Sequence, residues 1–264
     1  MRRTVQYVAV TCPVESADSR LALREFNRAR MRLASLWLGN AVDERFSAAC
    51  QEIEMKKPAV FIDRDGTINE QMGYVNHVSR FKILPGVPQA IRRLNRQGFH
   101  VLVVSNQSGV ARGYYPMDLV KTLHQILLTR IREKKGNIDG IFFCPHHPAG
   151  SVTEFSRDCD CRKPKTGLIE QACKSFEIDL QRSFVVGDMC TDIELAHKAG
   201  LTGILVKTGY GLGEIEYILP QKTVKPAHIA DDLLDAVRWI LERGKIDQPS
   251  HKTSLCKESS HGHQ

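Results

Sequence analysis

The sequence predicts an α/β fold, a doubly wound and mostly parallel sheet with helices on both faces. From Pro58 onward, short apolar runs alternate with segments whose apolar residues recur at helical spacing. Such alternation favours right-handed crossovers that bring the strands parallel and place helices on both sides of the sheet. The first apolar run, "AVFI", is continuous and partly β-branched, as expected for a strand that is covered on both faces.

Five strands and five helices are expected along the chain. The helix predicted over residues 118–136 has apolar residues at helical spacing, a basic last turn and a glycine stop, and Thr166 is a plausible N-cap for the next one. The predicted strands cover residues 59–62, 100–107, 138–144, 183–188 and 201–209. The predicted helices cover residues 87–97, 118–136, 166–178, 191–200 and 231–244.

The chain is expected to divide into three parts. Residues 1–57 form a helix-prone, arginine-rich extension that does not fit the alternation, residues 58–243 form the α/β domain, and residues 244–264 form a polar, disordered tail. The fold is complete without the extension. This favours an artefact of start-site choice, with Met55 opening the domain, over a small helical appendage.

Composition and charge narrow the function classes. No apolar run approaches the ~20 residues that span a bilayer, and "VQYVAV" is too short for a signal-peptide core, so we expect a soluble, cytoplasmic protein. The eight cysteines lack the short, secreted context of a disulfide framework. The net charge of +7 is compatible with nucleic acid, but the basic residues are spread along the chain, and a phosphorylated substrate benefits from the same positive field.

Polar side chains with complementary chemistry follow the predicted strands. Asp63 and Asp65 come directly after the first strand, in "AVFIDRDGTIN". Asp-Gly is also ordinary turn chemistry, but ligands of open parallel sheets sit beyond the carboxyl ends of the strands, where such a pair faces a crevice. The other groups expected at that edge are Ser105 and Asn106 in "SNQSG", Asp188 and Asp192 in "GDMCTD", and Arg162, Lys163 and Lys165 in "CRKPKTG".

This set of groups is typical of phosphoryl transfer. A carboxylate can attack phosphorus and form an aspartyl-phosphate, and because both partners are anions, Mg²⁺ and a cationic side chain must neutralise the charge. Hydroxyl and amide donors can hold the phosphoryl oxygens, and a second carboxylate can protonate the leaving alcohol and later activate water. The sequence therefore predicts a Mg²⁺-dependent phosphoryl-transfer site where the strands end.

The motifs "DRDGT", "SNQSG" and "GDMCTD", with a lysine before a motif helix, resemble those of the haloacid dehalogenase superfamily of phosphohydrolases. The resemblance implies that Asp63 is the nucleophile and Asp65 the general acid/base. It also implies that Ser105 holds the phosphoryl group and that Lys163 assists. Asp188 would bind Mg²⁺ together with the Asp63 carboxylate and the backbone carbonyl of Asp65.

A second cluster predicts a structural zinc site in a long loop. Cys144 and His146 are two residues apart, as are Cys159 and Cys161, and three thiolates with one imidazole complete a tetrahedral Zn²⁺ site. His147 is the competing ligand, but His146 mirrors the Cys-x-Cys spacing better. With no open position, such a metal would pin the loop and direct the residues after Cys161 towards the active site.

Together, "FIDRDGTIN", "GYV", "SNQSGVARG", "CPHHPAGS" and "CDCRKP" resemble a narrower group, the D-glycero-D-manno-heptose 1,7-bisphosphate 7-phosphatases. The resemblance implies a role in making heptose precursors of lipopolysaccharide core or surface glycans. Because the insertions between the expected elements are short loops, we expect no large cap domain. One departure is Met189, where the group often has lysine. The implied substrate contacts are Gly73, Tyr74, Ser105, Asn106, Gln107, Ser108, Arg162 and Lys163.

Two other functions remain open from the sequence. A histidinol-phosphate phosphatase has closely similar motifs and a similar zinc loop, and differs only in the lining of its pocket. A nucleic-acid end-processing or binding module would suit the basic charge and the zinc, but the chain has no G-x-x-x-x-G-K-[ST] motif. We therefore expect a monomer that acts on a small phosphorylated sugar and binds neither nucleic acid nor membrane.

Overall fold

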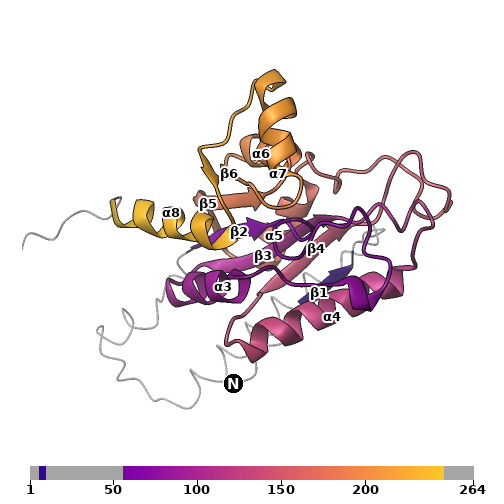
Figure 1. The fold of residues 1–264 in the computed structure, drawn as a ribbon, viewed down its shortest axis with the longest axis horizontal. Coiled ribbons are helices and arrows are strands. Elements are labelled where there is room, and N and C mark those ends of the chain that lie inside the picture. Colours follow the sequence, from indigo (N-terminus) through magenta and orange to yellow (C-terminus); the bar gives the residue numbers. More distant parts are fainter. Residues whose placement is uncertain (1–5, 10–55, 247–264) are drawn as a thin grey trace, which may run out of the picture.

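The computed structural model of the chain describes residues 6–9 and 56–246. Within them lies a seven-stranded sheet in the order β1-β4-β3-β2-β5-β6-β7, and every neighbouring pair is parallel (Figure 1). The chain enters the described sheet's centre at β2, moves outward on one side through β3 and β4, and returns to build the other side from β5. The strands are β1 (Gln6–Ala9), β2 (Lys57–Ile62), β3 (His100–Asn106), β4 (Gly140–Cys144), β5 (Ile178–Gly187), β6 (Thr202–Val206) and β7 (His228–Ala230).

Alternate residues of the central strand serve two hydrophobic cores, one on each face of the sheet. Val60 and Ile62 of β2 belong to a core that includes residues of α3, α4 and α8, whereas Ala59 and Phe61 belong to one that includes residues of α5 and α6. In Figure 1, α3 and α4 lie below the sheet and α6 lies above it. The longer helices are α3 (Val87–Arg96), α4 (Met117–Glu133), α5 (Gly167–Ser175), α6 (Cys190–Lys198) and α8 (Leu233–Ile246).

This arrangement confirms the predicted fold class, a doubly wound parallel sheet with helices on both faces. Between the last strands the chain makes short helical turns instead of a long crossover helix. These turns are α7 (Gly211–Gly213), η2 (Glu214–Ile218) and η3 (Leu219–Gln221), and η1 (Val78–Arg80) lies in the loop after β2. No helix among the described residues is long and apolar enough to cross a membrane.

The local structure differs from the expectations in two strands and confirms the position of one predicted helix cap. Part of the segment expected to be a helix-prone extension is a strand, because Gln6–Ala9 pairs with Gly140–Phe143 at the edge of the sheet; residues 10–55 and the expected tail from 247 lie outside the described residues. The short strand β7 was not expected. Thr166 is the N-cap residue of α5, as predicted, although its hydroxyl donates to the Glu170 carboxylate at 2.6 Å and not to the helix backbone.

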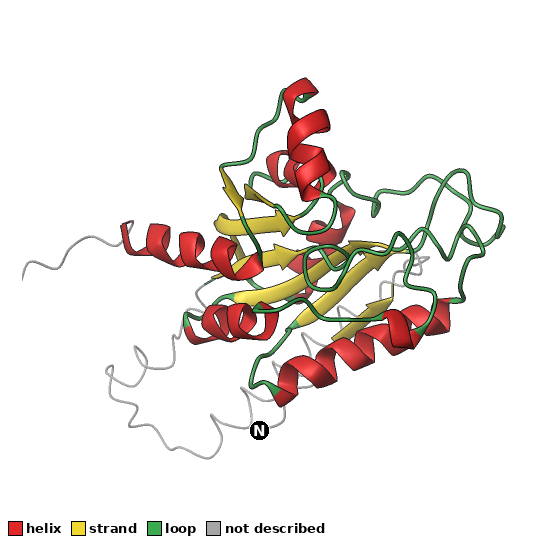
Figure 2. Cartoon of the chain, in the orientation of Figure 1, coloured by secondary structure: helices red, strands yellow, loops and turns green. Residues whose placement is uncertain are grey.

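The long loops gather at the edge of the sheet to which the strands point (Figure 2). They follow β2, β3 and β4, and each begins where a buried strand ends. β2 and β5 are neighbours at the position where the chain changes the side on which it adds strands. Such a switch point leaves a crevice beyond the carboxyl ends of the strands, which is where open α/β sheets bind their ligands.

Candidate active site and metal centres

One cavity of about 310 Å³ lies at this edge of the sheet. It is lined by every residue predicted to be catalytic or to contact substrate, so the loops do bring these residues together. The cavity also has lining residues that sequence reasoning did not single out as site residues. The full lining is Asp63, Asp65, Gln71, Gly73, Tyr74, Val75, Ser105, Asn106, Gln107, Ser108, Tyr115, Arg162, Lys163, Met189, Thr191, Asp192 and Tyr210.

A buried lysine neutralises the carboxylates at the base of the cavity. The ammonium of Lys163, a 5% exposed residue, donates to Asp63 Oδ1 at 2.5 Å and to Asp192 Oδ1 at 2.6 Å. A third bond runs to the carbonyl of Val104 at 3.0 Å. Burial alone would favour the neutral amine, but the charges of Asp192 and then Asp63 raise the pKa of Lys163 above its usual value, so the side chain stays cationic.

Three buried carboxylates approach one another closely enough to hold a divalent cation. Oxygens of Asp63, Asp188 and Asp192 lie within 4.8 Å of one another. Burial raises the pKa of Asp63 to about 7 and that of Asp188 to about 8. Asp188 Oδ2 accepts from the backbone N–H of Tyr210 at 2.8 Å, whereas Oδ1 has no partner among the described residues. This unpartnered buried oxygen and the hard carboxylate donors fit Mg²⁺.

The turn after β2 lets Asp188 approach the motif that contains the predicted nucleophile, Asp63. Gly66 has φ of +91°, and a Cβ built there would lie 2.0 Å from Asp188 Oδ2. Any other residue at this position would be strained and would also collide with the carboxylate. The Asp-Gly pair is therefore more than ordinary turn chemistry, since it lets the ends of β2 and β5 share one acidic site.

The second aspartate of the motif, Asp65, accepts hydrogen bonds at both of its carboxylate oxygens. Arg64 Nη2 donates to Asp65 Oδ2 at 2.7 Å, Gln107 Nε2 donates to the same oxygen at 2.7 Å, and Asn69 Nδ2 donates to Oδ1 at 2.9 Å. Burial opposes the charge of Asp65, but the Arg64 guanidinium and these hydrogen bonds hold its pKa below the usual value. The carboxylate is thus fixed near Asp63 and opens onto the same cavity.

Residues at the end of β3 form hydrogen bonds with Asp65 and with the loop that follows β4. Gln107 Nε2 also donates to Ser105 Oγ at 2.9 Å, so one amide links Ser105 to Asp65. Asn106 forms two hydrogen bonds with the backbone of Lys163, one to its carbonyl at 3.2 Å and one from its N–H at 3.0 Å. These bonds fix the lysine's backbone across 57 residues of chain, which places its ammonium beside Asp63.

The predicted zinc ligands form a compact cluster beside the cavity. The thiol of Cys159 lies 3.4 Å from that of Cys144 and 3.3 Å from that of Cys161, and His146 Nδ1 lies 3.3 Å from the Cys161 sulfur. A tetrahedral Zn²⁺ with bonds of about 2.0–2.3 Å holds its ligand atoms roughly 3.5–3.8 Å apart, so these residues fit zinc with little movement. The competing His147 lies elsewhere, with Nε2 2.9 Å from Arg112.

The structure revises two of the groups expected at the strand edge and adds two that the sequence did not indicate. Asp192 was expected at the strand edge but not as a member of the metal cluster, although its spacing from Asp188 is one helical turn. Lys165 does not reach the cavity, because it pairs with Asp158 on the surface at 2.8 Å. Arg64 and Tyr115 gave no sequence signal, since a buried arginine is rare and Tyr115 resembles an ordinary core aromatic.

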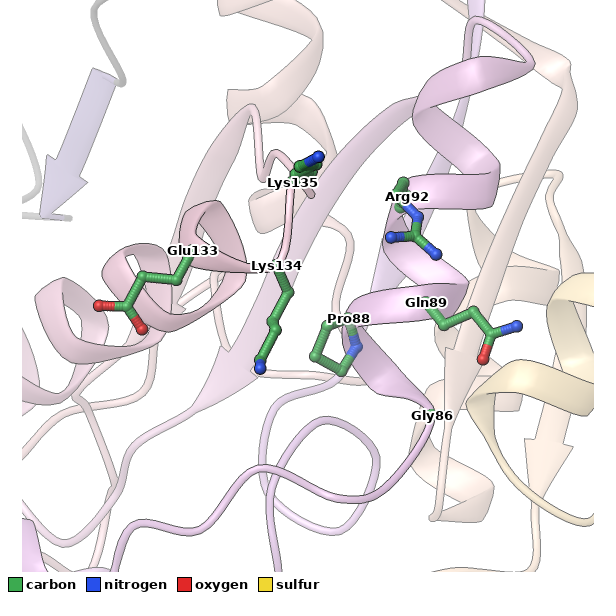
Figure 3. Close-up of a pocket in the computed structure, with 7 residues that line it drawn as sticks. All are labelled: Gly86, Pro88, Gln89, Arg92, Glu133, Lys134 and Lys135. Carbon is green, nitrogen blue, oxygen red and sulfur yellow. The ribbon is translucent and has the colours of Figure 1, made fainter.

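A larger cavity of about 450 Å³ lies away from this chemistry, between the start of α3 and the end of α4 (Figure 3). None of the predicted site residues lines it. Its charged residues at the end of α4 are exposed, and it contains no nucleophile or acidic cluster. It is lined by Gly86, Pro88, Gln89, Arg92, Glu133, Lys134 and Lys135. The smaller cavity at the strand ends is therefore the candidate active site.

Comparisons with known sequences agree with this geometry. Residues 160–236 match a family model described as "HAD-hyrolase-like". A D-glycero-D-manno-heptose-1,7-bisphosphate 7-phosphatase from Thermosynechococcus vestitus is 43% identical over 190 residues, which cover 70% of this chain and 96% of the relative. A D-glycero-beta-D-manno-heptose-1,7-bisphosphate 7-phosphatase from Escherichia coli K12 is 44% identical over 153 residues, covering 58% of this chain and 80% of the relative.

Solved structures show the same similarity. The D,D-heptose 1,7-bisphosphate phosphatase from B. bronchiseptica, complexed with magnesium and phosphate, matches with a TM-score of 0.62 at 29% identity, over 70% of this chain and 99% of that chain. The enzyme of that name from Burkholderia thailandensis matches with a TM-score of 0.51 at 29% identity, over 70% and 99%. This chain is a phosphatase and belongs to the haloacid dehalogenase superfamily, in its group of D-glycero-D-manno-heptose 1,7-bisphosphate 7-phosphatases.

Proposed function

We propose that the protein removes the 7-phosphate of D-glycero-D-manno-heptose 1,7-bisphosphate by Mg²⁺-dependent hydrolysis through an aspartyl-phosphate. The product would feed ADP- or GDP-heptose precursors of lipopolysaccharide core or surface glycans. The observation that carries the proposal is one cavity in which a carboxylate nucleophile, a second carboxylate, phosphate donors and two cations converge. The choice of substrate rests on the names of the relatives, and the choice of reaction rests on the geometry of the cavity.

Two carboxylates divide the reaction between them. An oxygen of Asp63 attacks the phosphorus while the bond to the sugar oxygen breaks, and Asp65, protonated in the reacting complex, gives that oxygen its proton as it leaves. In the second half, Asp65 takes a proton from water, which attacks the aspartyl-phosphate and releases inorganic phosphate. Lys163, 2.5 Å from Asp63, offsets the negative charge that gathers there, and Ser105 donates to a phosphoryl oxygen.

The acidic cluster supports the site that we propose for the metal. Asp63 and Asp188 would hold Mg²⁺ through their carboxylates, together with the backbone carbonyl of Asp65. Asp192 contributes to the cluster mainly by fixing Lys163, since one of its oxygens already accepts from the ammonium at 2.6 Å. When bound, Mg²⁺ neutralises charge between the attacking carboxylate and the phosphate.

A second cation favours a substrate with two phosphates. Arg162 lines the cavity, and its guanidinium forms no ion pair with any described residue; the contact it makes is a long one, 3.4 Å, to the carbonyl of His146. Lys163, by contrast, is fully engaged with two carboxylates. Arg162 is therefore the group that can bind the phosphate that stays on the sugar, while the reacting phosphate lies at Asp63.

The test is phosphate release, with Mg²⁺ present, from both anomers of heptose 1,7-bisphosphate and from histidinol phosphate. We expect kcat/KM for at least one bisphosphate anomer to exceed that for histidinol phosphate by about 10²-fold or more, because only the bisphosphate offers a second anion to Arg162. A preference for histidinol phosphate would move the enzyme into histidine synthesis and overturn the proposed substrate. It would leave the roles of the two aspartates untouched.

We expect Mg²⁺ to raise the thermal unfolding midpoint, and by more at about pH 8.5 than at about pH 5.5. Burial raises the pKa of Asp63 to about 7 and of Asp188 to about 8, from 3.8. The stabilisation that these two carboxyls gain from being protonated in the folded protein is fully present below pH 3.8 and is lost as the pH rises through about 8. The free energy of unfolding of the metal-free protein therefore falls over that range. At the lower pH the cation must also displace protons.

Differential scanning fluorimetry with and without Mg²⁺ measures both shifts. The Asp188→Asn variant is the control, because it removes the carboxylate with the unpartnered oxygen and should lose most of the metal-dependent shift. A larger Mg²⁺ shift at the acidic pH would contradict the assignment of these carboxylates as ligands.

A further inference from the structure

In the sequence, a buried arginine stands between the two motif aspartates, and its side chain binds the second of them, Asp65. Arg64 is only 1% exposed. Its Nη2 donates to both oxygens of Asp65, at 2.9 and 2.7 Å, and its Nε lies 3.3 Å from Oδ1. Such a two-oxygen contact fixes the plane and the direction of a carboxylate more strictly than a single bond does. The position of Asp65 therefore follows the position of the Arg64 guanidinium.

The other terminal nitrogen of Arg64 contacts a histidine from a helix 60 residues further along the chain. Nη1 lies 3.2 Å from Nε2 of His124, which is fully buried in α4. Arginine can only donate, so Nε2 is the acceptor and the ring proton resides on Nδ1. Burial and then the charge of Arg64 lower the pKa of His124 to about 3, which keeps that acceptor available.

The orientation that lets His124 contact Arg64 leaves its other ring nitrogen, Nδ1, without a hydrogen-bond partner within the described part of the chain. An unpaired buried N–H destabilises a fold, so an apolar side chain of similar size would suit this interior better if packing were the only demand. The polar ring is therefore explained by what it does for Arg64 and not by its own environment.

Aromatic rings hold this pair in place. The Phe143 ring in β4 meets the His124 ring edge-on, with centroids 5.0 Å apart and 69° between the planes. The guanidinium carbon of Arg64 lies 5.9 Å from the centroid of the Phe81 ring. Both phenylalanines are buried. Because α4 and β4 are packed elements, His124 presents a rigid acceptor on the side of Arg64 that faces away from Asp65.

We propose that His124 is a positioning residue for the phosphatase reaction, acting through Arg64 to keep the Asp65 carboxyl directed at the leaving oxygen. This inference rests on the proposed role of Asp65 as general acid. Gln107 completes the arrangement, since its Oε1 accepts from Arg64 at 3.0 Å while its Nε2 donates to Asp65 and Ser105. Gln107 thereby fixes the position of Asp65, the proposed acid, relative to Ser105, which would hold the phosphoryl group.

The test compares two leaving groups in the variant His124→Leu. A sugar alkoxide must be protonated as it leaves, whereas p-nitrophenolate leaves without a proton. Only hydrolysis of the sugar phosphate therefore depends on the orientation of the Asp65 carboxyl group. We expect kcat/KM for heptose 1,7-bisphosphate to fall about tenfold and kcat/KM for p-nitrophenyl phosphate to change by less than about twofold. This parameter covers the steps up to departure of the alcohol and excludes hydrolysis of the aspartyl-phosphate.

Conservative and matched variants separate positioning from structural damage. His124→Gln offers a side-chain oxygen to Nη1 and should recover most of the lost kcat/KM. His124→Phe keeps a ring without an acceptor and should repeat the loss if the leucine variant does not fold. Leu127→Ala, another fully buried position on α4, should lower the unfolding midpoint and leave the ratio between the two substrates unchanged.

Asp65→Asn distinguishes failure of this inference from failure of the proposed function. If Asp65→Asn lowers kcat/KM equally for both substrates, the general-acid role itself is wrong. If Asp65→Asn affects only the sugar phosphate but His124→Leu and His124→Phe affect both substrates equally or neither, the acid role stands and the positioning role of His124 is overturned. Selective loss in all three variants supports the proposal.

Discussion

Asp63→Asn should reduce turnover by at least about 10⁴-fold, because an amide oxygen is a poor nucleophile and cannot form the aspartyl-phosphate. The substitution also removes one of the carboxylates that would hold Mg²⁺. The measurement is phosphate release from heptose 1,7-bisphosphate under saturating substrate. Asp231→Asn is the matched control, since Asp231 is an exposed carboxylate paired with Lys207 on the surface and should leave kcat unchanged.

The same variant should remain folded, which excludes the simplest alternative explanation of lost activity. Burial raises the pKa of Asp63 to about 7, so its charged form destabilises the metal-free protein at about pH 8. A neutral asparagine removes that charge, and we expect the unfolding midpoint in metal-free buffer to rise. Activity close to that of the unmodified protein would remove Asp63 from the role of nucleophile.

The active-site motifs could be predicted because their geometry is local to strand ends. A buried strand followed by Asp-x-Asp-Gly fixes where two carboxylates lie, and parallel strands then bring Ser105 and Asp188 to the same edge. The zinc ligands were similarly accessible, since each pair lies within three residues of chain. In both cases the motif is contained in a short stretch of sequence, and the parallel sheet brings the separate stretches together.

What sequence reasoning missed depends on contacts between distant residues. β1 is a strand only because its backbone pairs with β4, more than 100 residues away, and nothing in "QYVA" itself requires that. His124 lies on the buried face of α4, where a single histidine resembles an ordinary core residue. Its contact with Arg64 follows from how α4 packs under the loop after β2, which no local pattern reveals.

Cys159→Ser should lose the zinc, lower the unfolding midpoint by about 10 °C and raise KM while lowering kcat. A hydroxyl is a poor Zn²⁺ ligand, and three remaining ligands cannot close the tetrahedral site. The loop that starts after Cys144 would then lose its anchor. Arg162 and Lys163 follow Cys161 directly, so both the substrate contact and the cation beside Asp63 would be displaced.

Zinc content measured by atomic emission, alongside the unfolding midpoint and the kinetics, checks this expectation. Cys173→Ser is the matched control, because Cys173 is exposed on α5 and lies outside the cluster. His146→Ala should behave like Cys159→Ser, whereas His147→Ala should keep its zinc, since only His146 directs a ring nitrogen at the thiols. Unchanged zinc content in Cys159→Ser would refute the ligand assignment, and loss of zinc with unchanged KM and kcat would show that the metal stabilises the loop without positioning Arg162 and Lys163.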